Sequence, residues 1–97
     1  MYQFNHEQYY IQEIDEYYYC IFCNESDDVY FINSTSKYVL DKLNMIDSVQ
    51  KIVSAYVADY EIDLEETPFE QILQEFQSLI TELVDHGIVK EISNVQI

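Results

Sequence analysis

The spacing of apolar residues changes once along this chain, near Asn33, and this change most restricts the folds that the chain can adopt. Before Asn33, apolar residues alternate with polar ones or form short runs of aromatic and β-branched residues, which is typical of strands. After Asn33 they recur every three to four residues, as in amphipathic helices. The pattern predicts strands at residues 9–14, 17–23 and 29–32, then three helices. Short connections favour an antiparallel meander of the strands.

The first two predicted helices have recognisable ends. Asn33 or Ser34 can cap the first helix, and Asn44 can end it because Asn tolerates the left-handed conformation. Asp47 and Gln50 have the spacing of a capping box at the start of the second helix. The second helix carries one apolar stripe, formed by Val49, Ile52, Val53, Tyr56, Val57 and Tyr60.

The third predicted helix has the strongest signals. Thr67 can cap it, Pro68 fits the first helical position, and Glu70 closes a capping box. Gly87, the only glycine, ends it. A short extended segment is expected at residues 88–92. The apolar face of the helix comprises Phe69, Ile72, Leu73, Phe76, Leu79, Ile80, Leu83 and Val84.

The chain is strongly acidic. Its 97 residues include 19 Asp and Glu against four Lys and Arg, which gives a net charge of −15. Binding to nucleic acid or to an anionic membrane is therefore disfavoured. A hydrophobic content of 48% supplies a core, and no apolar run is long enough to span a membrane. We expect one soluble, cytoplasmic α+β domain over residues 1–97, with a core region of about 9–92.

The cysteines and histidines, which often act in catalysis or bind metals, do not have the spacing that these roles need. In a strand, Cys20 and Cys23 would lie roughly 10 Å apart on opposite faces, which disfavours a disulfide. His6 and His86 lie near opposite ends of the chain, without metal-ligand spacing. We therefore expect no catalytic residue, no metal and no cofactor, and a binding or structural role.

The predicted strand at residues 29–32 is apolar on both faces and contains no Lys, Pro or Gly to protect an edge. If it lies at an edge of the sheet, an extended peptide could pair with it as a further strand. Alternatively, it is a central strand, or the segment at residues 88–92 covers it. The residues alone favour neither possibility.

Several short patterns in order along the chain resemble the PqqD-like family, also called RiPP recognition elements. They are Ile32-Asn33-Ser34-Thr35, Leu40-Asp41-Lys42-Leu43, Ser48-Val49-Gln50-Lys51-Ile52, Ile62-Asp63, Glu75-Phe76, Leu79-Ile80, Leu83 and Gly87-Ile88-Val89. The resemblance covers residues 9–92. The chain departs from the family pattern in having Asn44-Met45 where the family has Asp-Gly. It also has about one extra helical turn between Ile62-Asp63 and Glu75.

This resemblance implies a three-stranded antiparallel sheet followed by three helices, a winged helix-turn-helix-like arrangement. It also implies that the domain binds the leader of a ribosomally made precursor peptide as a fourth strand and presents it to a maturation enzyme or leader peptidase. The implied peptide-binding residues are Asp28, Val29, Tyr30, Phe31 and Ile32 on the strand, with Phe69, Leu73, Phe76, Gln77 and Ile80 on the third helix. Of the helix residues, Leu73, Phe76, Gln77 and Ile80 are favoured.

The charge suggests two further expectations. A domain of −15 should prefer a leader or an enzyme surface with basic residues, and such binding should weaken as salt rises. The alternative function is an acidic mimic of nucleic acid, or another protein-interaction module. A mimic would order its carboxylates in two rows on one surface.

Overall fold

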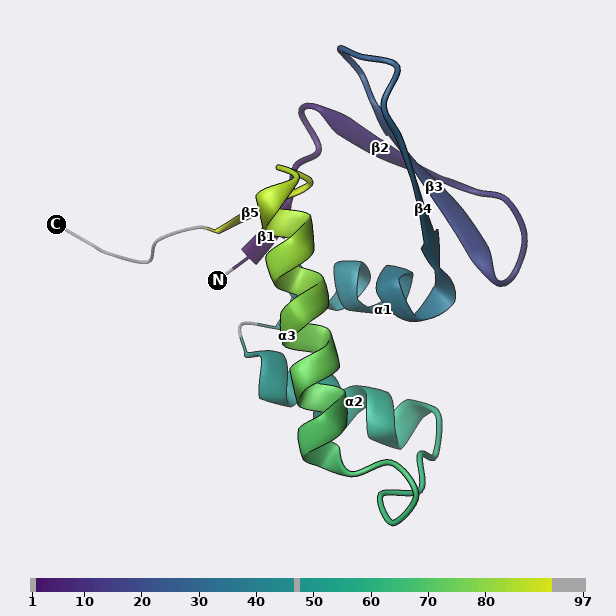
Figure 1. Ribbon diagram of the computed structural model, residues 1–97, viewed down its shortest axis with the longest axis vertical. Coiled ribbons are helices and arrows are strands. Elements are labelled where there is room, and N and C mark those ends of the chain that lie inside the picture. Colours follow the sequence, from purple (N-terminus) through teal and green to yellow (C-terminus); the bar gives the residue numbers. More distant parts are fainter. Residues whose placement is uncertain (1, 47, 92–97) are drawn as a thin grey trace, which may run out of the picture.

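The computed structural model describes residues 2–46 and 48–91. Figure 1 shows the long helix α3 along the molecule, the larger sheet at one end of it and α2 beside its beginning. The elements in chain order are β1 (Tyr2–Phe4), β2 (Tyr9–Glu13), β3 (Tyr18–Cys23), β4 (Val29–Asn33), α1 (Ser34–Leu43), α2 (Val49–Asp59), α3 (Phe69–Asp85) and β5 (Val89–Glu91).

The predicted meander is confirmed as a three-stranded antiparallel sheet in the order β2-β3-β4. Its register places Ile11 opposite Ile21, and Ile21 opposite Tyr30. Ile11, Ile21 and Tyr30 therefore lie on one face of the sheet. This face packs against the helices, as the complete burial of Ile21 indicates. The three strands lie within one residue of the predicted bounds at each end.

A second, two-stranded sheet was not predicted. β1 pairs antiparallel with β5, so Phe4 lies opposite Val89, and both side chains are buried. The N–H of Asn5 extends this pairing by donating to the carbonyl of Ile88 at 2.8 Å. The extended segment predicted at residues 88–92 is thus strand β5, although residue 92 lies outside the described residues. Residues 2–46 and 48–91 form an α+β fold, with five strands in two sheets and three helices.

Two of the expected helix ends differ in detail. Asn33 caps α1, since its Oδ1 accepts from the Ser36 N–H at 2.9 Å. Asn44 ends α1 in a right-handed conformation, with φ of −74°, so the expected left-handed cap is wrong. Its Oδ1 instead accepts from the Phe4 N–H at 3.3 Å, which ties β1 to the end of this helix. Ser48 caps α2, and the proposed cap Asp47 lies outside the described residues.

The predicted start of α3, with its capping box, is wrong, and its predicted end is confirmed. Pro68 occupies the cap position instead of the first helical position, and its carbonyl accepts from the N–H groups of Gln71 and Ile72. Thr67 therefore lies one residue before the cap, and no side chain caps the helix. Gly87 ends the helix as expected, with φ of +77°. The N–H groups of Gly87 and Ile88 donate to the carbonyls of Val84 and Leu83, which is the Schellman arrangement. This turn directs the chain into β5.

One hydrophobic core joins both sheets to all three helices. Five of the eight predicted apolar residues of α3 are buried in it, and the other three are half-buried. The core residues are Phe4, Ile21, Ile32, Val39, Leu40, Leu43, Ile52, Val53, Ile72, Leu73, Phe76, Ile80, Leu83, Ile88 and Val89.

Cys20 and Cys23 are unbridged. Within residues 2–46 and 48–91, no three His, Cys, Asp or Glu side chains lie close enough together to hold a metal ion. Among the same residues, no helix has the length and apolar character needed to cross a membrane.

A cluster of tyrosines joins α1 to the end of α2. The Tyr38 hydroxyl donates to the Asp59 carboxylate at 2.7 Å, and the Tyr38 ring lies 5.5 Å from the Tyr56 ring and 5.6 Å from the Tyr60 ring. Burial, followed by the hydrogen bond to Asp59, raises the pKa of Tyr38 above its ordinary value of 10.0. The fold therefore favours the protonated phenol.

Because of this raised pKa, the free energy of unfolding should depend on pH in the alkaline range. The contribution of Tyr38 is complete below pH 10, the unfolded value, and is lost as pH rises above it because deprotonation becomes easier in the unfolded chain. We expect Tyr38→Phe to lower the free energy of unfolding by about 1 kcal/mol at pH 7. It should also flatten the fall in stability between pH 9 and pH 11, as measured by urea unfolding. An unchanged alkaline slope in Tyr38→Phe would contradict this role.

Candidate peptide-binding groove

β4 forms one edge of the three-stranded sheet. β3 pairs with one side of it, and nothing else in residues 2–46 and 48–91 pairs with the other side. The segment that could have covered this edge lies elsewhere, because β5 pairs with β1. Of the two possibilities that the sequence left open, the structure therefore supports the exposed edge strand (Figure 1).

The main-chain groups that face this open edge belong to Val29 and Phe31. The Cys23 N–H donates to the Asp28 carbonyl at 3.3 Å, which makes these two residues a hydrogen-bonded pair of the ladder. Hydrogen-bonded and non-hydrogen-bonded pairs alternate along an antiparallel ladder. Tyr30 and Ile32 consequently bond to β3, whereas the N–H and C=O groups of Val29 and Phe31 point away from it. Val29 and Phe31 thus offer two donors and two acceptors to another extended chain.

The side chains of β4 divide between the two faces of the sheet. Phe31 is 73% exposed and Val29 is 41% exposed, both on the face turned away from the helices. On the other face, Ile32 is buried, and the half-buried ring of Tyr30 lies 5.0 Å from the His86 ring. An incoming strand would therefore meet an apolar neighbour on its outer face and the last turns of α3 on its inner face.

A pocket of about 220 Å³ lies between β4 and the C-terminal half of α3. Its apolar lining comes from both elements, and Glu82 and His86 add polar groups on the helix side. The Tyr9 hydroxyl fixes this end of the helix by donating to the His86 carbonyl at 3.1 Å. The lining residues are Tyr30, Phe31, Ile32, Asn33, Ser36, Leu79, Glu82, Leu83, His86 and Ile88. The pocket can take one apolar side chain from a strand paired with β4.

The open edge of β4 and the pocket beside it together form the candidate groove. Two groups near this groove have shifted pKa values. Burial is the main cause that raises the pKa of Tyr9, so its hydroxyl stays protonated and continues to donate to the end of α3. The hydrogen bond from the Ser26 side chain, with help from the Glu25 backbone, lowers the pKa of the Cys23 thiol. The Cys23 N–H donates to the carbonyl of Asp28, the residue directly before β4.

The helix residues expected from the family resemblance lie in different places. Leu73, Phe76 and Ile80 are buried in the core, with 6%, 3% and 2% of their surface exposed. Gln77 is exposed, in a shallow polar depression that shares Glu82 and His86 with the groove. Phe69 is half-buried at the first position of the helix, far from its C-terminal end. Their role in peptide binding stays a prediction.

The helix residues that line the groove beside β4 are Leu79, Glu82, Leu83 and His86, which the sequence did not single out as site residues. They follow one another at helical spacing and lie in the turns just before Gly87. The sequence feature that could have indicated these residues is Gly87, which ends the helix just before the segment predicted to be extended. Since the chain leaves α3 at Gly87 for a strand, the end of this helix must lie near the sheets.

Comparison with protein families gives a match over most of the chain. Residues 20–89 match the family described as coenzyme PQQ synthesis protein D (PqqD). A search of curated proteins and a search of solved structures return no significant match. The matched region includes all of β4 and α3, whereas β1 and β2 lie before it. Since the match covers more than two thirds of the 97 residues, this chain belongs to the PqqD family.

Proposed function

We propose that this protein binds the leader segment of a ribosomally made precursor peptide and presents it to a modifying or processing enzyme. The leader adds to the open edge of β4 as a fourth strand of the sheet. The protein itself acts in the cytoplasm as a recognition element, without catalysis and without a cofactor. Holding the leader raises the local concentration of the rest of the peptide at the enzyme.

The observation that carries this proposal is the open, apolar edge of β4 beside a pocket. Unprotected edges are a liability for soluble proteins, which usually cover them or place charged residues on them. Here Val29 and Phe31 leave both their main-chain groups and their apolar side chains exposed. Such an edge suits main-chain pairing with a peptide, and the neighbouring pocket suits recognition of one of its side chains.

The proposed site combines residues from both sides of the groove. Asp28, Val29, Tyr30, Phe31 and Ile32 supply the strand side. On the helix side, Leu79, Leu83 and His86 contact the ligand, and Gln77 borders it. Leu73, Phe76 and Ile80 hold the helix in place by packing in the core. In this winged helix-turn-helix-like arrangement, α3 contacts a peptide instead of nucleic acid.

Charge favours a leader with Lys or Arg beside its apolar anchors. Asp28 directly precedes β4, and Glu82 lines the pocket on the helix side. The whole chain carries −15, so a basic leader or a basic enzyme surface would associate faster and more tightly at low salt.

The proposal is tested by titration of a synthetic leader into the wild-type protein and into Phe31→Arg. The candidate leader is chosen by searching the DNA next to this protein's gene for a short reading frame. Because Phe31 is exposed, the variant should stay folded. Loss of the apolar contact should weaken binding roughly 10- to 100-fold, as measured by calorimetry.

Tyr10→Arg is the matched control. Tyr10 lies on the same outer face as Phe31 and is 50% exposed, but it belongs to β2, about 10 Å from β4 across the sheet. Binding should survive in Tyr10→Arg. Equal affinity of Phe31→Arg and the wild-type protein would contradict strand addition on β4 and would favour the alternative, an acidic mimic of nucleic acid that binds through its carboxylates.

A further inference from the structure

The opposite edge of the sheet is also open. β2 pairs only with β3 within residues 2–46 and 48–91. The Asn24 N–H donates to the Gln8 carbonyl at 2.7 Å, and the Ile14 N–H donates to the Tyr18 carbonyl at 3.0 Å. Even-numbered residues of β2 are therefore the ones that bond to β3, and the N–H and C=O groups of Ile11 and Glu13 point outward.

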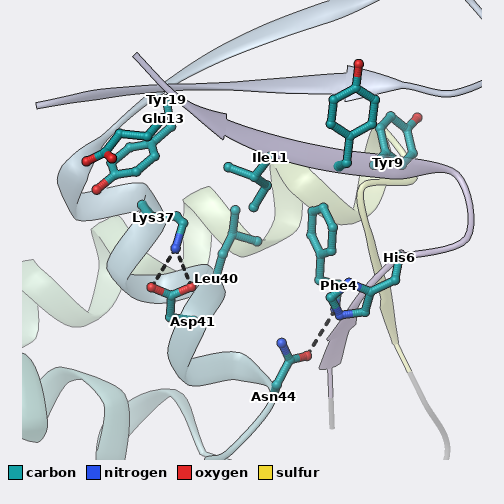
Figure 2. Close-up of a pocket in the computed structure, with 11 residues that line it drawn as sticks. Phe4, His6, Tyr9, Ile11, Glu13, Tyr19, Lys37, Leu40, Asp41 and Asn44 are labelled. Atoms are coloured by element: carbon teal, nitrogen blue, oxygen red, sulfur yellow. Dashed lines mark hydrogen bonds and ion pairs between the residues drawn. The ribbon is translucent and has the colours of Figure 1, made fainter. Parts of the chain in front are cut away.

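A pocket of about 630 Å³ lies beneath this edge, between β2 and α1 (Figure 2). Figure 2 shows Ile11 pointing from β2 toward Leu40 of α1, with Phe4 beside them. Leu40 and Phe4 are core residues, so the floor of the pocket is apolar and well packed. Such a concave apolar site with a few polar groups at its rim is the usual form of a ligand-binding site.

The charged groups of the pocket leave one carboxylate without a partner. The Lys37 Nζ lies 2.6 and 2.8 Å from the two carboxylate oxygens of Asp41, and 5.4 Å from the centre of the Tyr19 ring. Lys37 thus already forms an ion pair with Asp41. Glu13 lies directly opposite Tyr19 in the sheet, and its carboxylate makes no hydrogen bond or ion pair with the part of the chain described.

These features together favour an arginine side chain. Its apolar stem can lie on Phe4, Ile11 and Leu40, and its planar guanidinium can pair with Glu13 through two hydrogen bonds. A guanidinium also stacks on an aromatic ring such as that of Tyr19 better than an ammonium group does. We propose that the pocket between β2 and α1 binds an arginine of an extended segment of a partner protein, which pairs with the open edge of β2.

The occupant belongs to another protein. All four basic residues among residues 1–97 are lysines, at positions 37, 42, 51 and 90, so these residues supply no arginine. β2 and most of the pocket wall on the strand side also precede the region that matches the family. Because β2 and β4 are the opposite edges of the sheet, the site is separate from the groove at β4, and it does not depend on the function proposed above.

The test uses the isotope-labelled full chain and the blocked pentapeptide acetyl-Thr-Val-Arg-Val-Thr-amide. At millimolar peptide, amide resonances of Ile11, Glu13, Tyr19 and Lys37 should shift, whereas those of Val29 and Phe31 should not. Replacing the arginine of the peptide by citrulline, which is neutral and nearly the same shape, should weaken binding at least fivefold. Acetyl-arginine amide, which has no extended main chain, should bind more weakly than the pentapeptide.

Two protein variants assign the effect to the pocket. Glu13→Gln removes the unpaired carboxylate and should lower the affinity for the pentapeptide at least fivefold. Glu65→Gln, an equal charge change at an exposed residue of the loop before α3, should have no effect. No shift, shifts confined to β4, equal binding of the citrulline peptide, or full affinity in Glu13→Gln would each overturn the proposal. Leader binding at β4, measured in the same sample, reports separately on the proposed function.

Discussion

Replacing Val29 by proline should abolish leader binding while leaving the protein folded. The N–H of Val29 points to the open edge of β4, so proline removes a donor to the leader and no bond to β3. The proline ring also occupies the space that the leader's main chain needs. We expect at least a 100-fold loss of affinity in calorimetric titration, with unchanged far-ultraviolet circular dichroism.

Glu13→Pro is the matched control for this prediction. Glu13 has the same position in the ladder as Val29, on the open edge of the opposite outer strand, so its N–H also points away from β3. The two variants thus make the same change at the two edges. Leader binding should survive in Glu13→Pro. Loss of binding in both variants, or in neither, would mean that the leader does not pair with β4.

Removing the side chain of Phe76 should have the largest effect on stability. Phe76 is one of the residues that the family resemblance places in the peptide groove, yet it is only 3% exposed. Its ring lies 5.2 Å from the Tyr56 ring, at the contact between α2 and α3. Phe76→Ala should lower the free energy of unfolding by about 3–5 kcal/mol in urea denaturation, because it leaves a cavity in the core.

The adjacent residue provides the comparison. Gln77 is exposed on the same helix, so Gln77→Ala should change the free energy of unfolding by less than about 0.5 kcal/mol. If Phe76→Ala lost little stability but strongly weakened leader binding, Phe76 would face the peptide and not the core. The burial described above would then be wrong for the peptide-bound protein.

The local features of this fold could be predicted from the sequence. The change of apolar spacing near Asn33 separated the strands from the helices, and Asn33 and Gly87 marked helix ends, as the structure confirms. Each of these signals acts within a few residues. Thr67 is not the cap of α3, because the helix begins one residue later than predicted and Pro68 takes the cap position.

The features that depend on distant parts of the chain could not be predicted. β1 has three residues, too few for a clear alternation, and it pairs with β5 at the other end of the chain. Whether β4 was an edge strand also depended on where the segment after Gly87 would go. On α3, an almost continuous apolar face gave no sign that the half-buried Leu79 and the core residue Leu83 line the groove, whereas Phe76 does not.

The open edge of β4 is the central claim, and amide hydrogen exchange tests it most directly. In the free protein, the amides of Val29 and Phe31 should exchange quickly, and those of Tyr30 and Ile32 slowly, because only the latter two bond to β3. Saturation with the leader should slow exchange at Val29 and Phe31 at least tenfold and leave the other two almost unchanged. Equally fast exchange at Val29 and Phe31 in the saturated complex would contradict the claim.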